Sequence, residues 1–222
     1  GRDVSRDKDM KTDDLIKMLA ADNASVAPPI SRTMVLALAA GMALAAAHFF
    51  TVLAVRPDFS YAITHEARFI FKFVFTLGLA LPAGLLVLRL ARPDGTAGVW
   101  KWLLILPLAL LAIAVGLEMQ VVPADHWRAA AMGSMPVACM KYIPLLSLTP
   151  LLAMLIALRA GAPSNPTAAG AAAGLVSAGI AAALYATFCA DDSPMFVAIW
   201  YVIGISIVVA IGALAGNRLL RW

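Results

Sequence analysis

The two cysteines are the residues of this chain best suited to chemistry, and the sequence contains no others. Cys139 lies in the stretch VACMKY, and Cys189 lies in YATFCADDSP, where a long apolar run ends. Neither belongs to a CxxC motif, the spacing that many reactive thiol pairs use. Three interpretations are open from the residues alone: unpaired thiols packed among helices, a structural disulfide, or a redox-active or metal-responsive pair.

Acidic residues follow the second cysteine directly, as Asp191 and Asp192. Negative charge beside a thiol attracts cations, but it also raises the thiol pKa and slows reaction as a thiolate. The sequence therefore slightly favours metal capture over fast redox chemistry at Cys189. No spacing of further ligands supports a complete metal site.

Ionisable residues also occur in or beside otherwise apolar segments, at His48, Lys72, Glu118 and Lys141. A charge in lipid is costly, so each is a functional candidate, although snorkelling or a local ion pair accounts for a lone residue equally well. Glu118 would pair naturally with Lys72 or Lys141. Because no Walker loop, HExxH or GxSxG motif is present, we predict a protein that is not an enzyme and uses no cofactor.

The elements that position these residues follow from composition. The chain has 62% hydrophobic and 14% charged residues and a mean hydropathy of +0.87, whereas a soluble domain has about 25% charged residues. Long apolar runs near the roughly 20 residues needed to cross a bilayer predict helices. We predict an all-α polytopic membrane protein, a bundle of six transmembrane helices at about residues 34–55, 69–88, 100–121, 137–158, 167–188 and 195–215.

Charge distribution sets the orientation of these spans. The pI near 9.3 does not indicate direct nucleic-acid binding, because the basic residues are spread along the ends of the apolar runs. Lysine and arginine are more frequent on the side that carries the termini, which predicts a multi-pass membrane protein with both termini in the cytoplasm. Residues 1–9 read as a remnant that precedes a natural start at Met10, and residues 34–222 form the membrane domain.

A short amphipathic helix is predicted in the cytoplasmic segment 10–33. Its apolar stripe contains Leu15, Ile16, Met18 and Leu19, and Asp13 and Asp14 favour its N-terminal end. An isolated helix of about 11 residues is marginal in water, so the stripe needs a surface. The protein's own loops, a partner groove and the bilayer interface are the three candidates.

Small residues recur at four-residue spacing in the last two spans. Gly170 and Gly174 form one GxxxG motif, and Gly212 and Gly216 form another. Such ridges let helices approach closely in lipid. The motifs predict helix packing, either inside one bundle or across a homodimer.

Three longer stretches resemble one protein family. They are MKTDDLIKMLAAD, CMKYIPLLSLTPLLAMLIALRAGAP and AALYATFCADDSPMFVAIWYVIGISIVVAIGALAGNRLLRW. Together they resemble the NrsF family, the negative regulators of sigma F, which are six-span inner-membrane anti-sigma factors. The similarity runs over most of residues 10–222.

This resemblance implies a mechanism. The cytoplasmic face, chiefly the N-terminal segment, would hold an extracytoplasmic-function sigma factor at the membrane, away from RNA polymerase. The family's paired cysteines correspond to Cys139 and Cys189 and would sense metal or oxidative stress from the outer side. The loops at 89–101 and 159–166, or a second protomer, would complete the binding surface.

Two other functions compete with this one. A quinone-linked thiol oxidoreductase also places cysteines at the outer end of a helix bundle, but it normally needs a reactive pair close in sequence. A small transporter or channel would need polar groups through the full depth of the membrane, and the inner halves of these spans contain almost none.

Overall fold

Helices are the only regular structure in the part of the chain that the computed structural model describes, which is Ile16 and residues 29–220. A helix satisfies its backbone hydrogen bonds within one segment, as an apolar chain in lipid requires. Six helical segments are long and apolar enough to cross a membrane. This confirms the predicted all-α bundle of six spans; the predicted N-terminal helix lies outside the described residues, except for Ile16.

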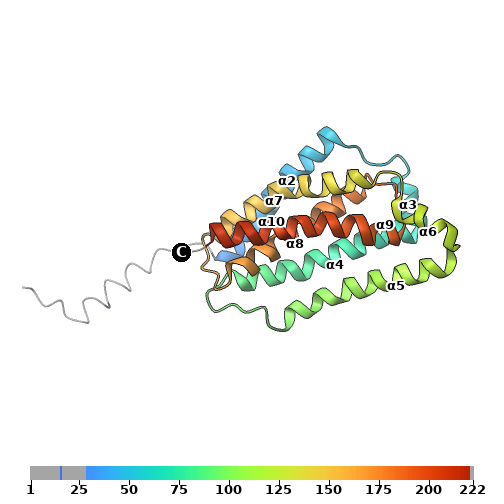
Figure 1. Cartoon of the computed structure of the whole chain (residues 1–222). Helices are drawn as coiled ribbons and strands as arrows, with labels where there is room; N and C mark the ends of the chain where they lie inside the picture. Colours follow the sequence, from blue (N-terminus) through green and yellow to red (C-terminus); the bar gives the residue numbers. More distant parts are fainter. Residues whose placement is uncertain (1–15, 17–28, 221–222) are drawn as a thin grey trace, which may run out of the picture.

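The six spans run antiparallel to their chain neighbours (Figure 1). They are α2 (Ile30–Val52), α4 (Ala67–Leu90), η1 (Gly98–Leu104) with α5 (Ile105–Val121), α7 (Pro136–Leu158), α8 (Pro166–Ala186), and α9 (Pro194–Phe196) continued by the π-helix η3 (Val197–Tyr201) and α10 (Val202–Leu219). Three spans begin at a proline, which fits the first helical turn because its missing N–H needs no partner there. The short helices α3 (Phe59–His65), η2 (Ala124–His126) and α6 (Trp127–Met132) lie in connections.

The bundle has two different ends. We call one the cysteine end; it carries the connections 53–58, 122–135 and 187–193 together with α3 and α6. We call the other the terminal end; it carries Ile30, Leu220 and the connections 91–97 and 159–165. Both described ends of the chain therefore lie on the side opposite to the cysteines.

Helix α8 is at the centre of the bundle and packs against α4, α7 and α10. Of its span 67% is buried, compared with 17% for the spans of α2 and α5. A Cβ on Gly170 would meet the backbone of Gly212 and come within 2.8 Å of the Gly216 Cα, and a Cβ on Gly174 would lie 2.7 Å from the Val208 carbonyl oxygen. The two GxxxG ridges are thus packed on each other within one chain.

Candidate functional site

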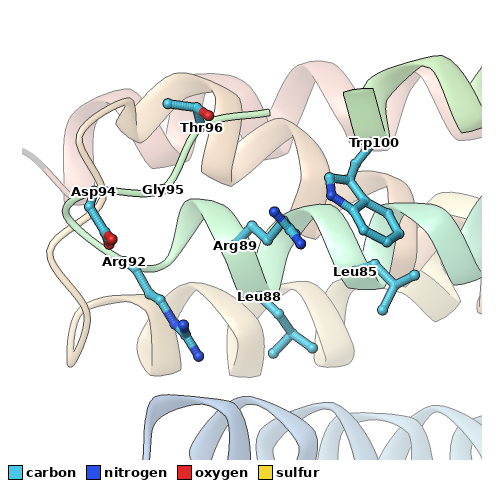
Figure 2. Close-up of a pocket in the computed structure, with 8 residues that line it drawn as sticks. All are labelled: Leu85, Leu88, Arg89, Arg92, Asp94, Gly95, Thr96 and Trp100. Carbon is cyan, nitrogen blue, oxygen red and sulfur yellow. The ribbon is translucent and has the colours of Figure 1, made fainter. Parts of the chain in front are cut away.

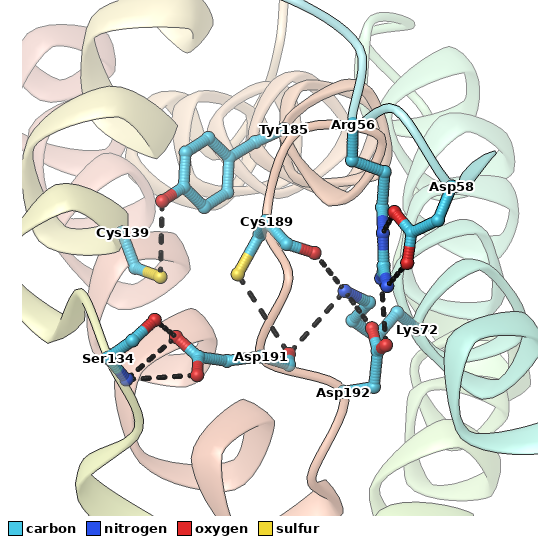
Figure 3. Close-up of polar contacts among 9 residues, drawn as sticks. All are labelled: Arg56, Asp58, Lys72, Ser134, Cys139, Tyr185, Cys189, Asp191 and Asp192. Atoms are coloured by element: carbon cyan, nitrogen blue, oxygen red, sulfur yellow. Dashed lines mark hydrogen bonds and ion pairs between the residues drawn. The ribbon is translucent and has the colours of Figure 1, made fainter. Parts of the chain in front are cut away.

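Cys139 and Cys189 meet at the cysteine end of the bundle. Cys139 lies in the first turns of α7, and Cys189 lies just after α8 in the connection 187–193. Both are buried and both are free thiols. Figure 3 shows both sulfur atoms in the space between α7 and the connection, where the Cys139 thiol is directed to the Tyr185 hydroxyl and the Cys189 thiol to the Asp191 carbonyl, at 3.8 Å. The antiparallel course of α7 and α8 brings these two positions to the same level.

Tyrosines line the space around the two thiols. The Cys139 thiol donates a hydrogen bond to the Tyr185 hydroxyl at 3.6 Å, and Tyr185 lies one helical turn before Cys189 on α8. The ring of Tyr201, from η3, lies 5.9 Å from that of Tyr185. Both tyrosines are fully buried, so the pair of thiols is enclosed by protein and is not open to lipid or water.

A buried lysine holds the connection that carries Cys189. Lys72 of α4 is completely buried, and its Nζ donates a hydrogen bond to the Cys189 carbonyl at 2.7 Å and pairs with Asp192 Oδ1 at 2.5 Å. Arg56 pairs with Asp192 Oδ2 at 2.8 Å and with Asp58 at 2.6 Å. These four charged side chains form the Lys72 network (Figure 3). A buried cation is tolerated when a carboxylate and carbonyls replace its hydration.

The other acid of the ADD motif fixes the same connection to the start of α7. The Asp191 carboxylate accepts hydrogen bonds from the Ser134 backbone N–H at 2.9 Å, from the Ser134 hydroxyl at 2.9 Å and from the Met135 N–H at 3.3 Å. Cys139 lies less than two helical turns after Ser134 and Met135. The separation of the two cysteines is therefore set from both sides, by α4 through Asp192 and by α7 through Asp191.

These contacts correct the predicted effect of the acids on the thiol. The pKa of Cys189 is lowered to about 7, first because Cys139 can donate a hydrogen bond to its thiolate and also because the Lys72 ammonium lies nearby, against the opposing effect of burial. Asp191 and Asp192 were expected to raise this pKa. The Asp191 carboxylate is instead engaged by hydrogen-bond donors, and the Asp192 carboxylate is engaged by Lys72 and Arg56.

The expected pairing of Glu118 with Lys72 or Lys141 is wrong. Glu118 Oε2 accepts hydrogen bonds from the Ser193 hydroxyl and the Met195 N–H, both at 2.9 Å, and Oε1 lies 3.6 Å from Arg68 Nη1. Lys72 instead forms its ion pair with Asp192 and donates a hydrogen bond to the Cys189 carbonyl, and both of these residues belong to the connection 187–193. Glu118 therefore ties α5 to the start of α9, next to the cysteine connection.

The remaining predicted site residues do not join the cysteine site. The Lys141 ammonium lies 5.3 Å above the ring of Tyr142. His48 is near the end of α2, and its Nε2 is buried without a hydrogen-bond partner among the described residues. Ile16 is helical and 57% exposed. The other residues of the predicted sigma-binding helix lie outside the described part of the chain: Asp13, Asp14, Leu15, Met18 and Leu19.

A metal held here would have few protein ligands. Within residues 29–220, no group of three or more histidine, cysteine, aspartate or glutamate side chains is arranged to hold an ion. The acids near the thiols are already engaged in hydrogen bonds and ion pairs. The arrangement fits a thiol pair that reacts as two sulfur atoms, either with each other or with one thiol-binding ion.

Sequence reasoning missed several partners of the cysteines. Arg56 and Asp58 belong to the turn RPDFS, a pattern that predicts a break between helices but no ion pair. Tyr185 precedes Cys189 by four residues, the spacing of one helical turn, and the Cys189 N–H donates a hydrogen bond to the Tyr185 carbonyl at 3.1 Å just past the end of α8. That spacing was the available signal for the tyrosine, whereas no sequence pattern links Arg56 to Asp192.

Replacing Lys72 with methionine should destabilise the bundle. The change keeps the length of the side chain but leaves Asp192 and the Cys189 carbonyl without their buried partner, and breaking a buried ion pair costs about 3–5 kcal/mol. Thermal unfolding of the purified protein in detergent measures this loss. Lys141→Met removes a lysine from the same end without breaking an ion pair, so it should unfold close to the wild type; equal loss in both variants would contradict the role assigned to Lys72.

Comparison with known proteins adds an independent finding. A family model described as negative regulator of sigma F, NrsF, matches residues 19–222. The chain is 35% identical over 215 residues to the probable anti-sigma-F factor NrsF of Azospira oryzae, and 36% identical over 220 residues to the anti-sigma-F factor NrsF of Caulobacter vibrioides. Each alignment covers 96% of this chain and 100% of the relative. No solved structure is significantly similar to the chain.

Proposed function

Because the chain belongs to the NrsF family of negative regulators of sigma F, we propose that it is a membrane anti-sigma factor that holds an extracytoplasmic-function sigma factor at the bacterial inner membrane. The observation that carries this proposal is the similarity to two anti-sigma-F factors along their whole length. Proteins of this family are regulators and not enzymes. The cysteine pair is therefore better read as a sensor than as the centre of a thiol oxidoreductase.

We assign different roles to two segments of the chain. Residues 10–33 bind the sigma factor, and residues 34–222 anchor the protein and receive the signal. The binding helix presents an apolar stripe that fits a groove on the partner. Its contact residues are Asp13, Asp14, Leu15, Ile16, Met18 and Leu19. A homodimer, if used to complete the surface, would need a face other than the α8 ridge, which α10 occupies.

The signal in this proposal is a change at the two thiols. Oxidation joins the Cys139 and Cys189 sulfur atoms in a disulfide, releases two protons and passes two electrons to a thiol oxidant. A soft metal ion instead displaces the thiol protons and binds both sulfur atoms. Either event links α7 to the connection 187–193 through the two sulfur atoms, which belong to free thiols in the structure.

A packed route leads from the cysteines to the N-terminal segment. Cys139 lies on α7, and α7 packs along α2. The Thr149 hydroxyl donates a hydrogen bond to the Gly41 carbonyl at 3.0 Å, and a Cβ on Gly41 would lie 2.9 Å from the Pro150 nitrogen. At such close backbone contact a shift of α7 moves α2, and α2 begins at Ile30, within the last residues of the proposed binding segment 10–33.

Changing either cysteine to serine should blunt the response to thiol-reactive metals and oxidants while leaving repression intact. Serine keeps the size of the side chain but forms no disulfide and binds soft metals poorly. A reporter gene under the sigma factor, measured with and without cadmium or diamide, tests this. A normal induction in both single variants would remove the cysteines from the mechanism.

A further inference from the structure

A second polar feature lies at the terminal end, far from the cysteines. Where α4 ends, a pocket of about 440 Å³ opens beside the connection to η1. Figure 2 shows Arg89, Arg92, Thr96 and Trp100 around it. The remaining lining residues are Leu85, Leu88, Asp94 and Gly95.

This pocket carries an excess of positive charge. The Arg89 guanidinium lies 4.5 Å from the centre of the Trp100 ring. Among the described residues, neither Arg89 nor Arg92 forms an ion pair, and Asp94, the one acid in the lining, forms none either. Both arginines are exposed. Two guanidinium groups against one carboxylate therefore face the pocket with their donors available to an anion.

An apolar groove of about 640 Å³ adjoins this pocket. It lies among α2, α4, α7 and α8, and Leu85 and Leu88 line both hollows. Gly84 lines the groove without a side chain, and a Cβ added there would have room, because it would contact only Val176, at 3.7 Å. The other side chains that the argument uses are Met34, Leu38, Leu81 and Ile180. A basic pocket and an apolar groove thus share a boundary along one face of α4.

We infer that the pocket and the groove form one binding site for an anionic phospholipid, with its phosphate between Arg89 and Arg92 and an acyl chain along the groove. The inference rests on the proposed membrane location and extends it. The terminal end is the proposed cytoplasmic side, where anionic lipids meet basic residues. Trp100 fits the same picture, since tryptophan is enriched at the boundary between apolar lipid and headgroups.

The site joins the lipid to α2, the helix whose first residues belong to the proposed binding segment 10–33. Met34 and Leu38 of α2 line the groove, and α4 supplies both arginines. The bound lipid bridges these two helices. It therefore contacts α2 within two turns of Ile30, on the route that the signal from the cysteines would take.

Lipid binding to the purified full-length protein tests this site without any sigma factor. In neutral detergent, phosphatidylglycerol should raise the melting temperature more than phosphatidylcholine does. Arg89→Gln with Arg92→Gln should weaken phosphatidylglycerol binding about thirtyfold, because each of the two basic residues contributes about 1 kcal/mol. The matched control is Arg32→Gln with Arg218→Gln, which removes the same charge from the same end and should bind as the wild type does.

A second variant tests the groove. Gly84→Leu fills it next to Leu85 and should weaken binding of long-chain phosphatidylglycerol, with the lipid-free melting temperature serving as the check on folding. Equal binding of phosphatidylglycerol and phosphatidylcholine to the wild type would overturn the proposal. So would full competition by inorganic phosphate combined with no effect of Gly84→Leu, which would reduce the site to an anion pocket. Neither of these results would bear on sigma-factor binding, because the lipid-binding assay contains no sigma factor.

Discussion

Replacing Leu15, Ile16 and Leu19 together with glutamate should switch on the sigma factor's genes in unstressed cells. The apolar stripe of the N-terminal helix would be desolvated in the partner's groove, and three unpaired carboxylates cannot enter such a groove at low cost. Losing anchor residues from an interface costs about 2 kcal/mol or more each, enough to release nearly all of the sigma factor. A transcriptional reporter measures the change directly.

The matched control adds a negative charge to the other face of the same helix. Lys17→Glu leaves the stripe intact, so repression should persist. Membrane fractions establish that the triple variant is still made and inserted. A silent reporter together with normal amounts of the triple variant in the membrane would show that the stripe is not the binding face.

Gly170→Ala should lower the stability of the bundle sharply. A methyl group at this position collides with the backbone of α10 at Gly212 and Gly216, and backbone cannot rotate away as a side chain does. Overpacking a tight interface costs about 1–3 kcal/mol, occasionally more. Because α8 is the central helix of the bundle, we expect the melting temperature in detergent to fall clearly below that of the wild type.

Gly116→Ala is the corresponding control on α5. A Cβ at Gly116 meets nothing within 4 Å, and alanine is a better helix former than glycine by about 1 kcal/mol in water. This variant should be at least as stable as the wild type. If Gly170→Ala and Gly116→Ala melted alike, the close contact between α8 and α10 would be disproved.

The helical spans were predictable because a chain in lipid must satisfy its backbone hydrogen bonds within helices or a closed barrel. Apolar runs near membrane length, separated by proline, glycine and charged residues, indicated six spans, and residues 29–220 contain six helices long and apolar enough to cross a membrane. The GxxxG spacing indicated close packing but could not identify the partner. That Gly170 faces Gly212 depends on the tertiary arrangement, in which α8 lies between α4, α7 and α10.

The cysteine site was predictable in position but not in chemistry. Antiparallel neighbours place Cys139 and Cys189 at one level, and this followed from the order of the spans. The effect of Asp191 and Asp192 on the pKa of Cys189 could not be predicted from the sequence, because it depends on which donors and cations contact the two carboxylates. Asp192 is neutralised by Lys72 and Arg56, contacts that join residues more than a hundred positions apart.

The Lys72 network also includes an aromatic ring at the cysteine end. Arg56 and Lys72 both lie 5.2 Å from the centre of the Phe69 ring, so an aromatic face and two carboxylates share the positive charge. The pKa of Asp58 is lowered, first by its hydrogen bond from Arg56. The cysteine connection is thus held in place by ion pairs and hydrogen bonds to Lys72 and Arg56.

The distribution of the sigma factor between membrane and cytosol tests the central claim most directly. Cells would express the full chain and its sigma factor, and both fractions would be probed before and after brief treatment with cadmium or diamide. We predict that the sigma factor lies in the membrane fraction of untreated cells, moves to the cytosol on treatment, and stays at the membrane when Cys139 and Cys189 are both serine. A sigma factor that is cytosolic in untreated cells containing the wild-type protein would contradict the account.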